Sequence, residues 1–258
     1  MSEPESLEPH VPEPPLFAQP EPESEPEPEP YPIWSWTDLA LLVSLALPLL
    51  LVSSLAAFPV ARLVPHVKAA GPIAGMFLFY LLWFCALYAL IRLRYRRPFW
   101  QSLAWVPPLG GLWRSALWGL LLAWVAVFLG VLLRTPDVKT PFQELLKDPV
   151  SLTLIGLLSV TLGPICEELA FRGFLLPLLV RSLGAVAGVL LSAAPFALLH
   201  GFQYAWTWQG LVIIFVAGAA FGWMRLRTGS TAACAVKQST YNLVLVAGLI
   251  AEKNRLTH

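Results

Sequence analysis

The sequence predicts an all-α, polytopic membrane protein, a bundle of about seven transmembrane helices that follows a disordered N-terminal tail. Two observations carry this prediction. First, 57% of the 258 residues are hydrophobic and only 13% are charged, whereas soluble domains are about half apolar and about a quarter charged. Second, seven apolar runs long enough to span a bilayer follow one another along the chain. These runs are too long and too little alternating for barrel strands, so helices are expected.

Residues 1–31 are expected to form the disordered tail, the first of three predicted regions. Proline and glutamate alternate in this tail, and nine of the chain's 16 acidic residues fall within its first thirty positions. Such a composition cannot bury enough apolar surface to fold and favours a stiff, extended chain. A solvated spacer is the simpler interpretation, and binding of a partner is the alternative.

The transmembrane helices make up the other two regions. The second region, 32–149, contains three apolar segments, and the third region, 150–251, contains four. In chain order the segments are 33–58, 71–91, 112–133, 150–180, 184–201, 208–224 and 230–251. Pro48 is expected to kink the first helix, because proline removes a backbone donor. Gly218 and Gly222 form a GxxxG pattern in the sixth, which is typical of close helix packing.

Basic residues between the segments predict the orientation. RLRYRR at 92–97 is the densest cluster, so the positive-inside rule places that loop in the cytoplasm. Arg181 and the pair Arg225 and Arg227 then lie on the same side, as does the N-terminus. We therefore expect an integral protein of the bacterial inner membrane with a cytoplasmic N-terminus and the lipid bilayer as a partner. No nucleic-acid partner is expected, because the basic residues do not form one stripe.

Three charged residues in the fourth segment are the main functional clue. GPICEELAFRGF at 163–174 places Glu167, Glu168 and Arg172 in an apolar run, where a charge is costly unless it is paired or used. Glu168 and Arg172 are four residues apart, so they share a helix face and can form an ion pair. Glu167 points about 100° away and stays available. The structural alternative is an ion pair that only pins helices together.

His200 is the only histidine in an apolar segment, and its depth matches that of the glutamates. The RSLG sequence at 181–184 predicts a tight turn between the fourth and fifth helices. At 1.5 Å per residue, Glu167 and His200 both lie about 22 to 26 Å from this turn. Ionisable residues within membrane segments usually mark a functional site. The two side chains can therefore face each other across the hairpin.

Polar residues in the seventh segment form a further group. KQSTYN at 237–242 places Gln238 and Asn242 four residues apart, on one helix face. Such amide side chains can join transmembrane helices by hydrogen bonds. They can also donate to the oxyanion of a reaction intermediate.

Together these motifs resemble those of the CPBP family of intramembrane proteases, which includes the CAAX prenyl endopeptidases and the bacterial Abi-type proteins. EELAFRG at 167–173 is similar to the EExxxR motif, and FALLH at 196–200 is similar to the FxxxH motif. The Gly-rich sixth segment, the RTGS turn and the polar residues that follow look like the rest of the family pattern. The resemblance covers about 100 residues, from about 150 to 250.

The resemblance implies a role for each site residue. Glu167 would activate water as a general base, and His200 would polarise that water or shuttle its proton. The pair of Glu168 and Arg172 would hold the site together, and Asn242 would stabilise the oxyanion. The implied protein is an intramembrane endopeptidase that hydrolyses peptide bonds of a membrane-associated peptide or protein substrate.

Gln238 and Lys237 mark the point at which the chain departs from the family, whose last motif usually begins with histidine. Gln238 cannot become cationic or ligate a metal well, so no cofactor is expected and zinc is disfavoured. Lys237 would either restore a positive donor or pair with Glu167. A catalytically degenerate member that acts as a membrane scaffold or immunity-type protein is thus a second hypothesis. A transporter with a glutamate proton relay is a third, although the sequence shows no inverted repeat.

Overall fold

The computed structural model describes residues 30–108, 110–138 and 140–256. Within these residues the ordered elements are all helical and none is a strand, which confirms the predicted all-α class. Of the predicted disordered tail, residues 1–29 lie outside the described part of the chain.

Four single α-helices are long and apolar enough to cross a membrane: α1 (Trp36–Leu63), α4 (Leu112–Leu132), α10 (Trp208–Thr228) and α11 (Thr231–Leu256). A fifth stretch of that kind, Ala70–Arg94, joins α2 (Ala70–Ala89) to a short π-helix. A sixth stretch of that kind, Pro149–Leu183, comprises α6 (Pro149–Val160), α7 (Leu162–Glu168), the π-helix η2 (Leu169–Leu175) and α8 (Leu176–Leu183). The shorter apolar helix α9 (Ala185–Leu199) follows it. The described chain thus has six such spans and one shorter helix, in agreement with the expected bundle of about seven.

Four short elements were not predicted from the sequence. They are η1 (Leu90–Arg94), which continues α2 as a π-helix, α3 (Phe99–Ser102), α5 (Pro141–Leu146) and the 3-10 turn η3 (Gly201–Tyr204). The predicted fourth segment is also interrupted, because Thr161 leaves helical geometry between α6 and α7. Pro164 explains this break, since it has no backbone N–H to donate to the carbonyl of Val160. α1, by contrast, stays helical through Pro48.

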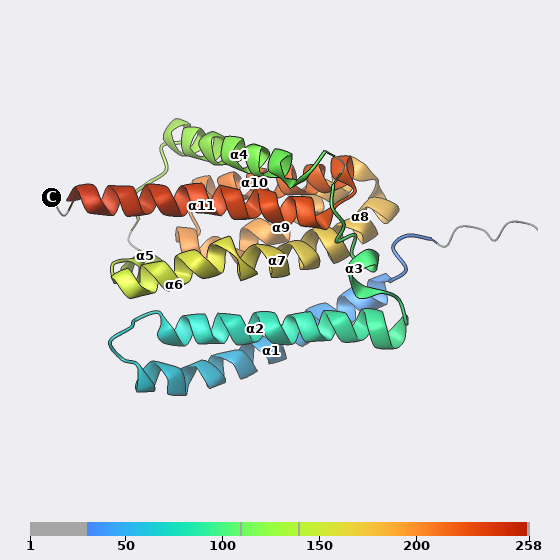
Figure 1. Ribbon diagram of the computed structural model, residues 1–258, viewed down its shortest axis with the longest axis horizontal. Helices are drawn as coiled ribbons and strands as arrows, with labels where there is room; N and C mark the ends of the chain where they lie inside the picture. Colours follow the sequence, from blue (N-terminus) through green and yellow to red (C-terminus); the bar gives the residue numbers. More distant parts are fainter. Residues whose placement is uncertain (1–29, 109, 139, 257–258) are drawn as a thin grey trace, which may run out of the picture. The chain divides into compact units, whose positions relative to one another are not determined.

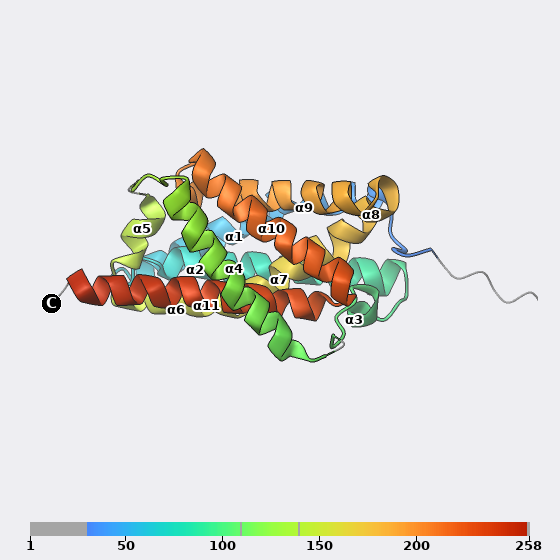
Figure 2. The ribbon, with the colours of Figure 1, turned by 90° about the horizontal axis from the view of Figure 1, so that it is seen from above.

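The helices associate mainly as neighbouring pairs. α1 packs along α2, α4 against α11, and α9 against both α8 and α10. Figure 2 shows that α4 crosses α11 at an angle. Gly119 lies at this crossing, because a Cβ added to it would come within 2.3 Å of the carbonyl oxygen of Lys237.

The fourth and fifth predicted segments form the expected hairpin. α8 ends at Leu183, and Gly184 turns the chain into α9 with a φ of 83°, a conformation that favours glycine. Gly218 and Gly222 of α10 then pack on α9, as the GxxxG pattern predicts: a Cβ at Gly218 would meet Ala193 at 3.3 Å.

Two hydrophobic clusters flank the stretch that carries the glutamates. The first includes Leu87 of α2 and Leu169 and Phe174 of η2, and the second includes Phe196 of α9 and Phe221 of α10. η2 therefore contributes to the first cluster through part of its surface. Its Phe171 packs against the second cluster.

The start of α1 is fixed to this same stretch by Trp34. The Trp34 ring is fully buried and stacks on Phe174 at a centroid distance of 4.8 Å. Its Nε1 donates to the Phe174 carbonyl at 3.0 Å, and Arg181 of α8 donates to the Trp34 carbonyl at 3.2 Å. The segment before α1 is thus held against η2 and α8.

Ser151 fixes the beginning of α2. Its hydroxyl oxygen accepts a 2.9 Å hydrogen bond from the backbone amide of Ala69, the residue that precedes α2. Asp148 caps α6 by accepting from the Ser151 amide at 2.9 Å and from the Ser151 hydroxyl at 2.6 Å. This network ties the beginning of α2 to the beginning of α6.

Candidate active site

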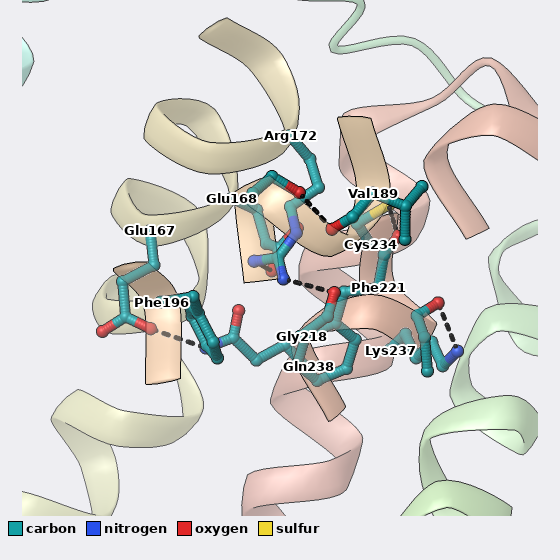
Figure 3. Close-up of polar contacts among 12 residues, drawn as sticks. Glu167, Glu168, Arg172, Val189, Phe196, Gly218, Phe221, Cys234, Lys237 and Gln238 are labelled. Atoms are coloured by element: carbon teal, nitrogen blue, oxygen red, sulfur yellow. Dashed lines mark hydrogen bonds and ion pairs between the residues drawn. The ribbon is translucent and has the colours of Figure 1, made fainter. Parts of the chain in front are cut away.

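Glu168 and Arg172 form a fully buried ion pair. Arg172 Nη1 lies 2.6 Å from Glu168 Oε1, and both side chains are 0% exposed. Arg172 Nη2 donates a second hydrogen bond, of 2.7 Å, to the carbonyl oxygen of Gly218 on α10 (Figure 3). The predicted pair is confirmed, and it also joins η2 to α10.

Three phenylalanine rings surround the guanidinium group of Arg172. Its central carbon lies 4.5 Å from the ring centroid of Phe196, 5.2 Å from that of Phe221 and 5.7 Å from that of Phe171. Aromatic faces attract a cation, and more strongly where water is excluded. The cage therefore helps to offset the cost of burying this charge.

Glu167 takes no part in the ion pair, as expected, but it does have partners. Tyr80 of α2 donates its hydroxyl to Glu167 Oε1 at 2.6 Å, and Gln238 of α11 donates its Nε2 to Glu167 Oε2 at 2.7 Å (Figure 3 shows the second contact). Each carboxylate oxygen thus accepts one hydrogen bond from a different helix. A carboxylate oxygen can accept more than one donor, so both keep a free acceptor position.

His200 ends α9, and the hydrogen bond of its ring determines its tautomer. Nδ1 lies 2.8 Å from the carbonyl oxygen of Phe196. A carbonyl oxygen can only accept, so Nδ1 carries the proton and Nε2 of the neutral ring is left as an acceptor. The ring also packs on Phe196, at a centroid distance of 4.7 Å. That His200 and Glu167 act on one water molecule stays a prediction.

Asn242 and Lys237 have hydrogen-bond partners away from Glu167. Asn242 Nδ2 donates to the carbonyl oxygen of Ser159 at 2.7 Å, which joins α11 to the end of α6. Lys237 is buried, and its Nζ donates to the carbonyl oxygen of Ala220 on α10 at 3.0 Å. Of the three polar residues considered on α11, Gln238 is the one whose described hydrogen bond goes to Glu167.

Metal ligands do not gather in the described part of the chain. Among those residues, no group of three His, Cys, Asp or Glu side chains is placed to hold a metal ion. The expectation that the protein uses no metal cofactor is not tested by this arrangement and stays a prediction.

Tyr80 is the site residue that the sequence reasoning missed. It belongs to α2, which carries no recognisable motif, and it precedes the motif-bearing segments. The only available signal was a hydroxyl group on an otherwise apolar helix, a signal that Tyr88 on the same helix also gives. The aromatic cage of Arg172 was also missed, because Phe196 was noted only as the first residue of the FxxxH motif.

Comparison with known families finds a match over the part of the chain that carries most of these residues. Residues 149–244 match the family model described as type II CAAX prenyl endopeptidase Rce1-like. No curated protein and no solved structure matches the chain. The matched range contains Glu167, Glu168, Arg172, His200 and Gln238 and leaves out Tyr80. With its long apolar helices, the chain is an integral membrane protein that is similar, at the level of the family, to CAAX proteases. The similarity is confined to residues 149–244, which match the Rce1-like domain of type II CAAX prenyl endopeptidases.

Proposed function

We propose that this protein is an intramembrane endopeptidase in which Glu167 activates the water that hydrolyses a peptide bond. One observation carries the proposal. Glu167 is held by donors on both of its carboxylate oxygens, beside a buried ion pair, within an Rce1-like domain. A general base has to be oriented toward the proton that it removes, and this arrangement supports that role.

The proposed reaction begins with a water molecule that donates a hydrogen bond to Glu167. The water oxygen attacks the carbonyl carbon of the scissile bond while Glu167 takes the water's proton. The resulting tetrahedral intermediate collapses as the carbon–nitrogen bond breaks, and the proton passes to the leaving amine. His200 would assist through its Nε2, which the Phe196 hydrogen bond leaves as an acceptor.

The proposed role of the ion pair is to hold Glu167 in place. Glu168 precedes the π-helix and Arg172 lies within it, and the Gly218 carbonyl fixes the guanidinium from α10. π-helical turns of this kind are frequent at functional sites. Asn242 would contribute to an oxyanion site only through its second amide hydrogen, because one is taken by Ser159.

The proposed substrate is a membrane-associated peptide or protein. Replacing Glu167 with Gln in the purified protein tests the function, with a panel of CAAX-like and transmembrane peptides and detection of products by mass spectrometry. We expect hydrolysis to fall by about 10²- to 10⁴-fold, the usual contribution of a general base. Glu252→Gln, at an exposed position on α11, is the control. Unchanged turnover in Glu167→Gln would refute the proposal.

The second candidate is a membrane scaffold that keeps the fold without the reaction. The contact between Gln238 and Glu167 favours it, because a glutamine holds the carboxylate but cannot exchange a proton with it. A wild-type protein that cleaves no peptide of the panel would support this candidate.

We further propose that the protein lies in the bacterial inner membrane with its N-terminus in the cytoplasm. Arg181 and Arg225 support this orientation. Arg181 donates to the carbonyl of Trp34, and Arg225 donates to the hydroxyl of Tyr31 at 2.9 Å. Both basic residues therefore lie at the end of the bundle where α1 begins, as the positive-inside rule requires for a cytoplasmic N-terminus.

A further inference from the structure

Tyr80 lies outside the Rce1-like domain but contacts the candidate active site. Its hydroxyl donates to Glu167 Oε1 at 2.6 Å, and Gln238 donates to Oε2 of the same carboxylate. The two donors come from α2 and α11, and Figure 1 shows α7 between these helices, both of which contact it. The carboxylate is thus held from two sides.

The position of Tyr80 is fixed by the packing of α2 at both ends. At the beginning of the helix, the amide of Ala69 is bound to Ser151 of α6. Toward its end, Leu87 is buried in the cluster that also contains Leu169 of η2. Tyr80 lies between these attachments, so its hydroxyl has little freedom to leave Glu167.

Gly163 lies directly beside this hydrogen bond. A Cβ at that position would lie 3.7 Å from the Tyr80 hydroxyl oxygen and 3.7 Å from Glu167 Oε1. A methyl group would already reach contact distance there, and a longer side chain would meet both oxygen atoms. The region around the Tyr80–Glu167 contact is therefore closely filled.

We propose that Tyr80 is a positioning residue that orients the carboxylate of Glu167, so that α2 completes the active site of the Rce1-like domain. The inference rests on the proposed function. The terminal torsion of a glutamate is broad, so a carboxylate held at one oxygen still rotates about it. A second donor on the other oxygen removes this freedom and fixes the plane in which a water molecule is accepted.

A purely structural role would have different consequences. If the hydrogen bond only attached α2 to α7, its loss would lower stability and leave the rate of the reaction at each active site unchanged. If it positions the base, its loss lowers kcat, because even a small displacement of a reacting group costs up to about 10²-fold in rate. KM would stay within about twofold of the wild-type value, because Tyr80 acts through Glu167 and not on the substrate.

Tyr80→Phe tests the inference, because it removes the hydroxyl and keeps the ring. Tyr88→Phe on the same helix is the matched control, since Tyr88 is 43% exposed. We expect kcat for the best peptide of the panel to fall about 10- to 100-fold in Tyr80→Phe and to be unchanged in Tyr88→Phe. A wild-type kcat in Tyr80→Phe, with hydrolysis lost in Glu167→Gln, would overturn the inference and leave the proposed function standing.

A thermal unfolding cycle provides a readout that needs no substrate. Tyr80→Phe is measured in the wild-type background and in the Glu167→Ala background. We expect it to lower the melting temperature in the first and to have little effect in the second, because its acceptor is then absent. Equal decreases in both backgrounds would overturn the inference. If the effects of the two substitutions are coupled but no peptide is cleaved, the proposed peptidase function is overturned. The hydrogen bond by which Tyr80 holds Glu167 is then still supported.

Discussion

Gln238 donates its side-chain amide to Oε2 of Glu167 over 2.7 Å, so α11 contacts the carboxylate through a side chain that cannot exchange a proton. Where the sequence resemblance implies a histidine, the glutamine keeps a hydrogen-bond donor at the glutamate. Unlike a histidine, the glutamine is not a group that can gain and lose a proton near neutral pH. The question that this contact raises is whether the protein needs such a group.

Gln238→His should increase peptide hydrolysis if a proton-exchanging side chain limits the wild-type protein. General acid–base groups contribute about 10²- to 10⁴-fold, so a gain of at least about 10-fold is expected. The measurement is the rate of product formation at saturating peptide. Gln238→Asn, which keeps the amide but shortens its reach, is the control and should lose activity. Equal rates for wild type and Gln238→His would show that residue 238 does not limit the reaction.

Arg172→Ala should destabilise the protein severely. The change leaves Glu168 buried without its cation and leaves the Gly218 carbonyl without its donor. Loss of one partner of a buried pair costs about 3–5 kcal/mol. Thermal unfolding in detergent measures the effect, with Arg92→Ala at an exposed position as the control. Similar melting temperatures for the two variants would contradict the assigned role of the pair.

Gly119→Ala should destabilise the protein, whereas Gly130→Ala on the same helix should not. A Cβ at Gly119 would come within 2.3 Å of the Lys237 carbonyl oxygen, but the nearest atom to a Cβ at Gly130 is Thr135 Oγ1, at 3.8 Å. Helix propensity alone favours alanine over glycine by about 1 kcal/mol, so the two variants should shift the melting temperature in opposite directions. A rise in both would show that α4 does not cross α11 at Gly119.

The cap of α6 should depend on pH through Asp148. The hydroxyl and the amide of Ser151 hold the pKa of Asp148 below its usual range. A carboxyl whose pKa is lower in the folded state stabilises the fold above its unfolded pKa, and this contribution is lost as the pH falls through the folded pKa. Asp148→Ala should therefore lower the melting temperature at pH 7 and have a smaller effect at pH 3. The difference between variant and wild type should stay constant from pH 6 to pH 8.

Local spacing was sufficient to predict the ion pair of the candidate site and two of the helix contacts around it. Glu168 and Arg172 are one helical turn apart, so their pairing follows from the sequence alone and is confirmed. The RSLG turn and the glycines of α10 are also short-range signals, and both led to correct helix contacts. Such features depend on neighbours within one helix or one turn, which is the information that a single sequence contains.

Contacts between remote helices were the part that the sequence could not supply. Tyr80 and Glu167 are brought together by the packing of α2 on α6 and α7, and no periodicity in α2 distinguishes Tyr80 from Tyr88. The sequence also could not show that Lys237 points toward α10, because adjacent residues on α11 face different helices. The π-helix η2 was not predicted either, because an apolar helical pattern does not distinguish a π-helix from an α-helix.

The buried charges gain their partners at different stages of the synthesis of the chain. Glu168 and Arg172 can neutralise each other as soon as their own stretch becomes helical, before any later helix has left the ribosome. Glu167 finds its first donor on α2, which has already emerged, and its second on α11, which emerges later than the helix of Glu167 itself. In a nascent chain that stops before α11, Glu167 therefore lies among apolar helices with only the first of these two donors. Completion of the site therefore has to wait until α11 has been synthesised.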